Sequence, residues 1–216
     1  MRRAEPIVEF VGVPGAGKST IARAFRPMLP NAQGLQLPPA PFRGSPTLLA
    51  RAAAFLLSLR PLQPNDLHRM VRIIQAHRVY EQGLATPLLL EQGLMQRLWA
   101  ILADRRRYSE QGLDRLIESM AGAAPDLIVR VKTPHNVAAA RIHTRPHGNS
   151  RYERLGLAEI TARLGPADAL YDKLVGLVRR HAGVAIVEVS GLDPAEANAA
   201  RVAAGLAAAR SGQGSA

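Results

Sequence analysis

The sequence predicts an α/β fold in which helices cover both faces of a parallel sheet. Five short apolar runs alternate with longer stretches of helical character, which is the pattern of doubly wound α/β proteins. A glycine-rich segment at residues 12–20 joins the first of these runs to the helix that follows it. Because continuous apolar runs are typical of strands buried on both faces, we expect three layers with a five-stranded sheet in the middle.

The order of the elements follows from these patterns. The expected strands span residues 7–11, 33–37, 87–91, 126–131 and 184–189. After the glycine-rich segment and its helix, the expected helices span residues 45–60, 66–82, 94–108, 109–120, 136–144, 158–181 (interrupted at Gly165-Pro166) and 194–209. We expect one domain over residues 1–210 and a loose tail over residues 211–216.

The composition narrows the class of protein. Apolar residues make up 47% of the 216 residues, which suffices for one sizeable core, and the lack of cysteine excludes disulfides and thiol chemistry. No run is long enough to span a membrane and no signal peptide is recognisable, so we expect a cytoplasmic location. The formal net charge of +11 indicates a polyanionic partner, which could be nucleic acid, an acidic membrane or a small molecule rich in phosphate.

The glycine-rich segment fits the pattern G-x-x-x-x-G-K-[ST], the phosphate-binding loop (Walker A motif) of nucleoside-triphosphate enzymes. Glycines allow the backbone to wrap closely around phosphate and to point its N–H groups inward, and the following helix adds its positive dipole end. Lys18 would then bind the β- and γ-phosphates, and the Ser19 hydroxyl would bind Mg²⁺. The predicted nucleotide-binding residues are Gly12, Val13, Pro14, Gly15, Ala16, Gly17, Lys18, Ser19 and Thr20.

Glu91 ends the third apolar run and is a second candidate for chemistry. In open α/β sheets, ligands bind beyond the carboxyl ends of the strands, where this carboxylate would lie. There it could accept a proton from an attacking hydroxyl or hold Mg²⁺, and the sequence does not decide between these roles.

Arginines are concentrated between residues 141 and 154, with proline and glycine between them. Phosphoryl transfer spreads negative charge over the γ-phosphate oxygens, and arginine can bind that charge with paired donors. We therefore expect a lid over residues 141–155, in which Arg141, Arg145 and Arg151 act on the transferred group.

Together, the phosphate loop, the strand that ends in Glu91 and the arginine-rich segment resemble a small-molecule P-loop kinase of the thymidylate kinase and deoxynucleoside kinase type. The resemblance implies a P-loop fold, use of ATP with Mg²⁺, and transfer of the γ-phosphate to a nucleoside, a nucleotide or a similar metabolite. It also implies that the ATP base lies beside residues 191–194. Gln92 departs from the pattern, because this family commonly has arginine after the acid at the end of the third strand.

Several alternatives remain open at this stage. A regulatory NTPase could bind nucleic acid through its basic surface, although aromatic stacking residues are only 4% of the chain, which makes nucleic acid a less favoured partner. A kinase could instead act on a lipid- or polysaccharide-linked acceptor, because residues 48–59 are unusually apolar. The same stretch could belong to the core or to a homodimer interface. Glu9 lies inside the first strand, where we expect an arginine to pair with it.

Overall fold

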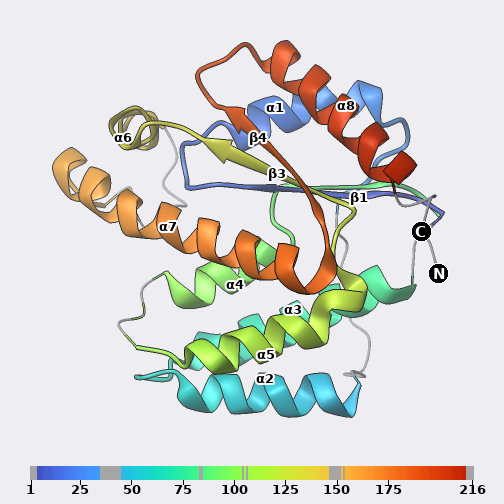
Figure 1. Ribbon diagram of the computed structural model, residues 1–216. Helices are drawn as coiled ribbons and strands as arrows, with labels where there is room; N and C mark the ends of the chain where they lie inside the picture. The colour runs from blue at the N-terminus through green and yellow to red at the C-terminus, as the bar shows by residue number, and fades with distance from the viewer. Residues whose placement is uncertain are drawn as a thin grey trace.

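The computed structural model of the protein describes residues 4–34, 45–82, 85–103, 105, 107–145, 152 and 154–212. Within these residues, helices and strands alternate along the chain (Figure 1). In order they are β1 (Ile7–Val11), α1 (Lys18–Phe25), η1 (Arg26–Met28), α2 (Pro46–Ser58), α3 (Pro64–Gln82), β2 (Leu88–Leu90), α4 (Leu94–Leu102), α5 (Glu110–Met120), η2 (Ala121–Ala123), β3 (Leu127–Lys132), α6 (His135–His143), α7 (Leu157–Ala182), β4 (Ala185–Ser190) and α8 (Ala195–Gly212).

The sheet is parallel and its strand order is β2-β1-β3-β4. The central strand β1 aligns Val8 with Leu89 on one side and with Leu127 on the other. The carboxyl ends of the strands therefore meet at one edge, and the turns that follow them can build a common site.

The prediction of five strands is wrong for the part of the chain that the structure describes, where the sheet has four. Of the predicted strand at residues 33–37, only Gln33 and Gly34 are described. Gln33 forms a single parallel bridge with Leu88 at the edge of β2. Glycine at the next position has no side chain to pack on a sheet, which weakens a strand at this point.

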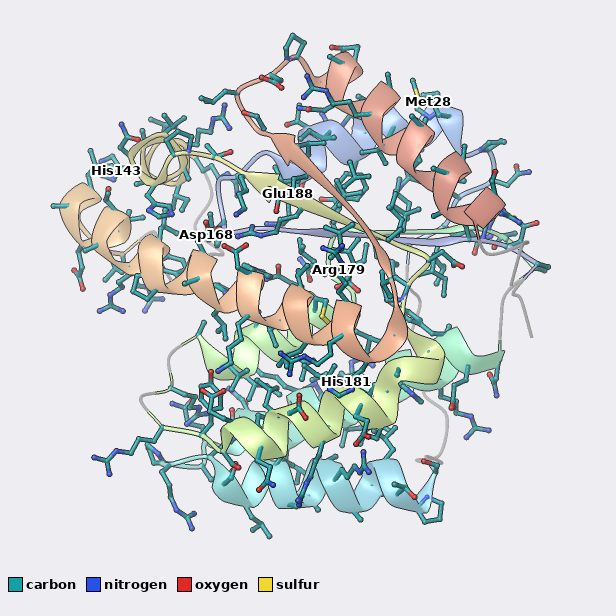
Figure 2. All side chains as sticks on the ribbon, in the orientation of Figure 1. Met28, His143, Asp168, Arg179, His181 and Glu188 are labelled. Atoms are coloured by element: carbon teal, nitrogen blue, oxygen red, sulfur yellow. The ribbon has the colours of Figure 1, made fainter. Side chains whose placement is uncertain are left out.

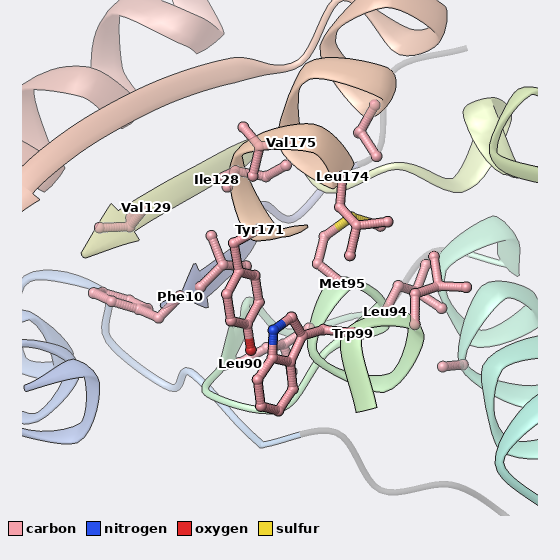
Figure 3. Packing of buried hydrophobic residues seen from close by; sticks show 14 of the residues in the cluster. Phe10, Leu90, Leu94, Met95, Trp99, Ile128, Val129, Tyr171, Leu174 and Val175 are labelled. Carbon is pink, nitrogen blue, oxygen red and sulfur yellow. The ribbon is translucent and has the colours of Figure 1, made fainter. Parts of the chain in front are cut away.

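Helices cover both faces of the sheet, as predicted. Figure 1 shows α1 and α8 on one face, while α4 and α7 cover the other face and α3, α5 and α2 lie further out. This arrangement buries β1 completely, since all five of its residues are inaccessible to solvent. A large part of the core lies between the sheet and α4 and α7, where Trp99 and Tyr171 are packed (Figure 3). Phe10 points to the other face of the sheet, where its ring centroid lies 6.4 Å from that of Phe25 on α1.

Two helices differ from the prediction. The helix expected at residues 158–181 continues through Pro166, because Leu164, Ala167 and Tyr171 are buried on both sides of the proline and their packing outweighs the local cost. The helix expected at residues 94–108 ends at Leu102. Beyond its end, the guanidinium of Arg105 is buried against the carboxylate of Asp66.

The apolar stretch at residues 48–59 belongs largely to the core. Leu48, Phe55 and Leu59 are fully buried, and α2 packs against α5. Leu57 points outward and is 67% exposed. None of the helices in the described residues combines the length and the apolar character that a membrane crossing requires.

Candidate active site

The phosphate loop connects the buried strand β1 to the amino terminus of α1. Gly15 has a φ of 79°, and a Cβ at this position would lie 2.3 Å from the carbonyl oxygen of Ala138, so only glycine fits. Gly17 has a φ of 98° and precedes α1 without a side-chain cap. Because α1 also has no acid in its first turn, its positive end is free to bind an anion.

Lys18 is folded back onto its own loop. Its Nζ donates hydrogen bonds to the carbonyl oxygens of Gly12 (2.6 Å) and Val13 (3.1 Å). Burial is the main reason that the pKa of Lys18 is lowered to about 8, and the positive charge of Arg145 lowers it further, against the opposing effect of Glu91. A phosphate group that takes over from the carbonyls would raise the pKa of this lysine and favour its charged form further.

Glu91 follows β2 directly and lies beside the first turn of α1, where the Ser19 hydroxyl donates a hydrogen bond to its carboxylate. The two residues come from segments 72 positions apart, and the parallel sheet brings them together. Both face a cleft of about 220 Å³ that is lined by Pro14, Gly15, Ala16, Gly17, Lys18, Ser19, Thr20, Glu91, Gln92, Gln96 and Arg145. The residues Pro14–Thr20 of the predicted nucleotide-binding set thus line the cleft, whereas Gly12 and Val13 are buried beneath it.

The three predicted lid arginines have different positions. Arg141 lies on α6 and donates hydrogen bonds to the carbonyl oxygens of Gly15 (3.4 Å) and Gly191 (3.0 Å), so it ties the phosphate loop to the turn after β4. Arg145 follows α6 and is exposed in the wall of the cleft. Arg151 lies outside the described residues, as do residues 146–150 of the predicted lid.

The turn after β4 lies against the phosphate loop. A Cβ at Gly191 would come within 2.0 Å of the Ala16 carbonyl oxygen, and the Thr133 hydroxyl donates a hydrogen bond of 2.9 Å to the same oxygen. Sequence reasoning missed Thr133, although it follows the carboxyl end of β3 and the argument used for Glu91 applies to it as well.

Glu9 has a different partner from the one predicted. Its fully buried carboxylate accepts hydrogen bonds from the backbone N–H groups of Leu94 (3.1 Å), Met95 (2.7 Å) and Gln96 (3.3 Å), at the amino terminus of α4. The expected ion pair with arginine is absent from the described residues, because the unsatisfied N–H groups of a helix end take its place.

Burial nevertheless raises the pKa of Glu9 to about 7, against the lowering effect of the three N–H groups. Its packing is also tight, since a Cβ at Gly93 would lie 2.4 Å from the Glu9 carboxyl carbon. Glu9 thereby holds the turn that carries Glu91 and Gln92 against β1.

A second buried charge lies on the neighbouring strand β3, and it does have partners of opposite sign. The Arg130 guanidinium, 1% exposed, binds Asp168 at 2.5 Å and Asp172 at 2.9 Å. Both acids project from α7, and Figure 2 shows Asp168 on the side of this helix that faces the sheet. Tyr171 lies between these two acids in the sequence of α7. Its ring stacks on that of Trp99, with the ring centroids 5.1 Å apart, and its hydroxyl donates a hydrogen bond to the Gln96 side chain in the cleft.

The described residues of the cleft offer Mg²⁺ a hydroxyl and a carboxylate. Within the described residues, no three His, Cys, Asp or Glu side chains come together as a metal site. The Ser19 hydroxyl and the Glu91 carboxylate are hard oxygen donors, however, and Mg²⁺ commonly takes one or two such groups together with substrate phosphates and water. The donor set therefore fits Mg²⁺ that arrives with a nucleotide.

Comparisons with known proteins support the fold. No family model and no curated protein sequence matches the chain. Among solved structures, deoxyadenosine kinase from M. mycoides with bound dATP is similar over 93% of this chain and 99% of that chain, with 12% identity and a TM-score of 0.56. Thymidylate kinase from Candida albicans is similar over 99% of this chain and 94% of that chain, with 14% identity and a TM-score of 0.54. The resemblance inferred from the sequence is thus confirmed at the level of the fold, which is the fold of deoxynucleoside and thymidylate kinases.

Proposed function

We propose that this protein is an ATP-dependent phosphotransferase that moves the γ-phosphoryl group to a hydroxyl or phosphate of a nucleoside, a nucleotide or a similar small metabolite. One observation carries the proposal. The Glu91 carboxylate contacts Ser19, the residue after the phosphate-loop lysine, in an open cleft at the carboxyl edge of the sheet. An acceptor in this cleft would lie between a bound γ-phosphate and a carboxylate.

The residues of the cleft then have distinct tasks. The phosphate-loop N–H groups and Lys18 bind the β- and γ-phosphates, and Ser19, with Glu91 through water, would hold Mg²⁺. Bound Mg²⁺ would neutralise charge that develops on the phosphate oxygens. As the acceptor oxygen bonds to the γ-phosphorus, the bond from phosphorus to the oxygen of ADP breaks, and Glu91 accepts the hydroxyl proton. Arg145, which is exposed in the wall of the cleft, would stabilise the transferred group.

The test is a screen of ATP consumption over nucleosides, nucleotides and sugars, with the wild-type protein and Lys18→Ala side by side. We expect at least one acceptor to raise ADP production above the rate without acceptor, and Lys18→Ala to remove that increase. ATP hydrolysis that responds to RNA or DNA and to no small acceptor would instead support a regulatory NTPase, for which the net charge of +11 provides an attraction. A panel that includes lipid- and polysaccharide-linked acceptors tests the remaining alternative.

A further inference from the structure

In the described part of the chain, two arginines on neighbouring helices lack the carboxylate partners that the buried arginines Arg105 and Arg130 have. Arg72 lies on α3 and Arg97 on α4, and these helices pack against each other. Both side chains are half-buried. The Nε of Arg97 is buried with no hydrogen-bond partner among the described residues. Arg72 makes only a long hydrogen bond of 3.4 Å there, to the neutral side chain of Gln75.

No described acid forms an ion pair with either arginine. All but two of the 17 Asp and Glu residues, Asp104 and Glu153, lie in the described part. No ion pair found among these described residues includes Arg72 or Arg97. By contrast, the buried arginines Arg105 and Arg130 are each bound to carboxylates.

The acid whose charge reaches Arg97 is already occupied. Glu9 acts on Arg97 electrostatically, but its two oxygens accept the three N–H groups of α4. Burial lowers the pKa of Arg97, and the nearby positive charge of Arg72 lowers it further, against the opposing effects of Tyr80 and Glu9. Two like charges therefore lie partly desolvated on facing helices, an arrangement that costs free energy until an anion binds between them.

The pair lies next to residues that line the cleft. Gln92 and Gln96 line the cleft beside Glu91, and Arg97 follows Gln96 on α4. Arg69 of α3 donates a hydrogen bond to the carbonyl oxygen of Ala100 on α4, so the helix faces that carry Arg72 and Arg97, three positions from these residues, lie toward each other. An acceptor whose reacting group lies at Glu91 would extend along α4 toward Arg97. Guanidinium groups bind carboxylate and phosphate through paired donors, and they do so most strongly where water is partly excluded.

We propose that Arg72 and Arg97 form a binding site for an anionic group of the acceptor, either a carboxylate or a phosphate, that is separate from the group that receives the phosphoryl group. This inference rests on the proposed function. It predicts that the substrate is a hydroxylated metabolite with a second, negatively charged end, and that a neutral compound of the same shape is a poorer acceptor. The pair then sets which acceptors are used, while the phosphate loop sets the donor.

Matched acceptors and matched variants test the site. The compounds are ribose and ribose 5-phosphate for a phosphate end, and glucose and gluconate for a carboxylate end. The variants are Arg72→Gln and Arg97→Gln, and the control is Arg179→Gln, which removes an exposed arginine of α7 that is labelled in Figure 2. We expect the first two variants to raise KM for the preferred anionic acceptor about tenfold, as for loss of one charge-assisted pair. KM for ATP and for the neutral acceptor should stay within about twofold, and the control should behave like the wild type.

The melting temperature of the two variants provides a second test. If the arginines had a structural role, their loss would lower Tm, whereas the proposal predicts no decrease. Because each substitution relieves the repulsion between two cations, Arg72→Gln and Arg97→Gln should fold with a Tm equal to or above that of the wild type. A clear fall in Tm with no change in the KM for the anionic acceptor would make the pair structural and would overturn the proposal.

Binding without turnover separates this inference from the proposed function. Titrations with ribose 5-phosphate, gluconate and inorganic phosphate are made by calorimetry on wild type, Arg97→Gln and Lys18→Ala. Lys18→Ala removes the cation of the phosphate loop and leaves the arginine pair intact, so an affinity that Lys18→Ala keeps and Arg97→Gln loses belongs to the arginine pair. If that affinity is found but no compound is phosphorylated, the site stands and the proposed function fails. If neutral acceptors are phosphorylated as well as anionic ones and Arg97→Gln changes no affinity, the proposed function stands and the anion site is wrong.

Discussion

The phosphate loop and the proposed acceptor site differ in how their charges are satisfied. On the phosphate side, polar groups are hydrogen-bonded within the protein: Lys18 and Arg141 both donate to backbone carbonyls. On the proposed acceptor side, the guanidinium groups of Arg72 and Arg97 lie half-buried without a carboxylate partner in the described part of the chain. The phosphate side therefore keeps its shape without a ligand, whereas the acceptor side has charges that a ligand would complete.

This difference indicates how the two substrates would be recognised. A backbone loop with fixed glycine geometry binds any polyphosphate of the right size, so it provides affinity with little discrimination. Side chains from two separate helices bind a group only when its charge and its distance from the reacting atom both fit, so they provide specificity. Variants on the two sides should accordingly change different kinetic constants.

The largest effect is expected for Lys18→Ala, which removes the cation of the phosphate side. We expect kcat/KM to fall by about 10³-fold or more, equivalent to about 4 kcal/mol, because the lysine is proposed to bind the β- and γ-phosphates. The measurement is ATP turnover with the best acceptor, and circular dichroism checks the fold. Arg23→Ala is the matched control, since it removes an exposed cation from the same helix and should leave turnover unchanged. Near-normal turnover of Lys18→Ala would show that the loop does not bind the reacting phosphate.

The next largest effect is expected for Glu91→Gln, at the border between the two sides. The variant keeps the size of the side chain and can still contact Ser19. Its neutral amide cannot act as the base, and it attracts Mg²⁺ less strongly than a carboxylate does. We expect kcat to fall about 10²-fold while the affinity for ATP changes little. Single-turnover phosphorylation and ATP binding by calorimetry measure the two quantities separately. Glu196→Gln, on the exposed side of α8, controls for the loss of one negative charge.

The phosphate side could be predicted from the sequence because its geometry is local. Gly15, Gly17 and Lys18 lie within a few residues of one another, and their spacing alone specifies a wrapped loop at a helix end. Glu91 could be predicted as a site residue from a general rule, namely that ligands bind at the carboxyl ends of parallel strands. Both inferences depend on one strand and the turn that follows it.

The acceptor side could not be predicted, because it depends on which helix faces which. Arg72 and Arg97 are 25 positions apart by their residue numbers, and nothing in either helix pattern indicates that their side chains share one space. The sequence also suggested arginine as the partner of Glu9, since a buried carboxylate needs compensation. It could not show that the N–H groups of α4, 85 to 87 positions away, would provide that compensation.

Glu9 links the two sides, because it lies in β1, the strand before the phosphate loop, and binds the start of α4. The pH dependence of protein stability tests how much this link contributes. Its pKa is about 7 in the folded protein and 4.5 ordinarily, so between these values the unfolded chain loses its proton first. Stability from this group is thus fully present below pH 4.5 and is lost as pH rises through 7, by about 3 kcal/mol in total. Glu9→Gln cannot titrate in this range. The unfolding free energy of the wild type minus that of the variant should therefore decrease between pH 5 and 8.

Urea denaturation of both proteins at several pH values measures this difference, and Glu196→Gln, which alters an exposed acid, should leave it nearly flat. A difference that is constant, or that increases with pH, would mean that the three N–H groups keep Glu9 ionised in spite of its burial. The start of α4 would then be held by a permanent charge, and the link between the two sides would be independent of pH.

The smallest effect separates two arginines of the phosphate side. Arg145 is exposed in the cleft wall, so Arg145→Ala should lower kcat about tenfold, or about 1.4 kcal/mol, and leave Tm unchanged. Arg141 instead ties Gly15 to Gly191 through their carbonyl oxygens, so Arg141→Ala should lower Tm and raise KM for ATP. Rates, KM values and melting curves of the two variants distinguish a residue that acts on the transferred group from one that holds the loop in place. If both variants lower kcat about equally with no change in Tm, Arg141 leaves its carbonyl partners when ATP binds, and the phosphate side is less fixed than its hydrogen bonds indicate.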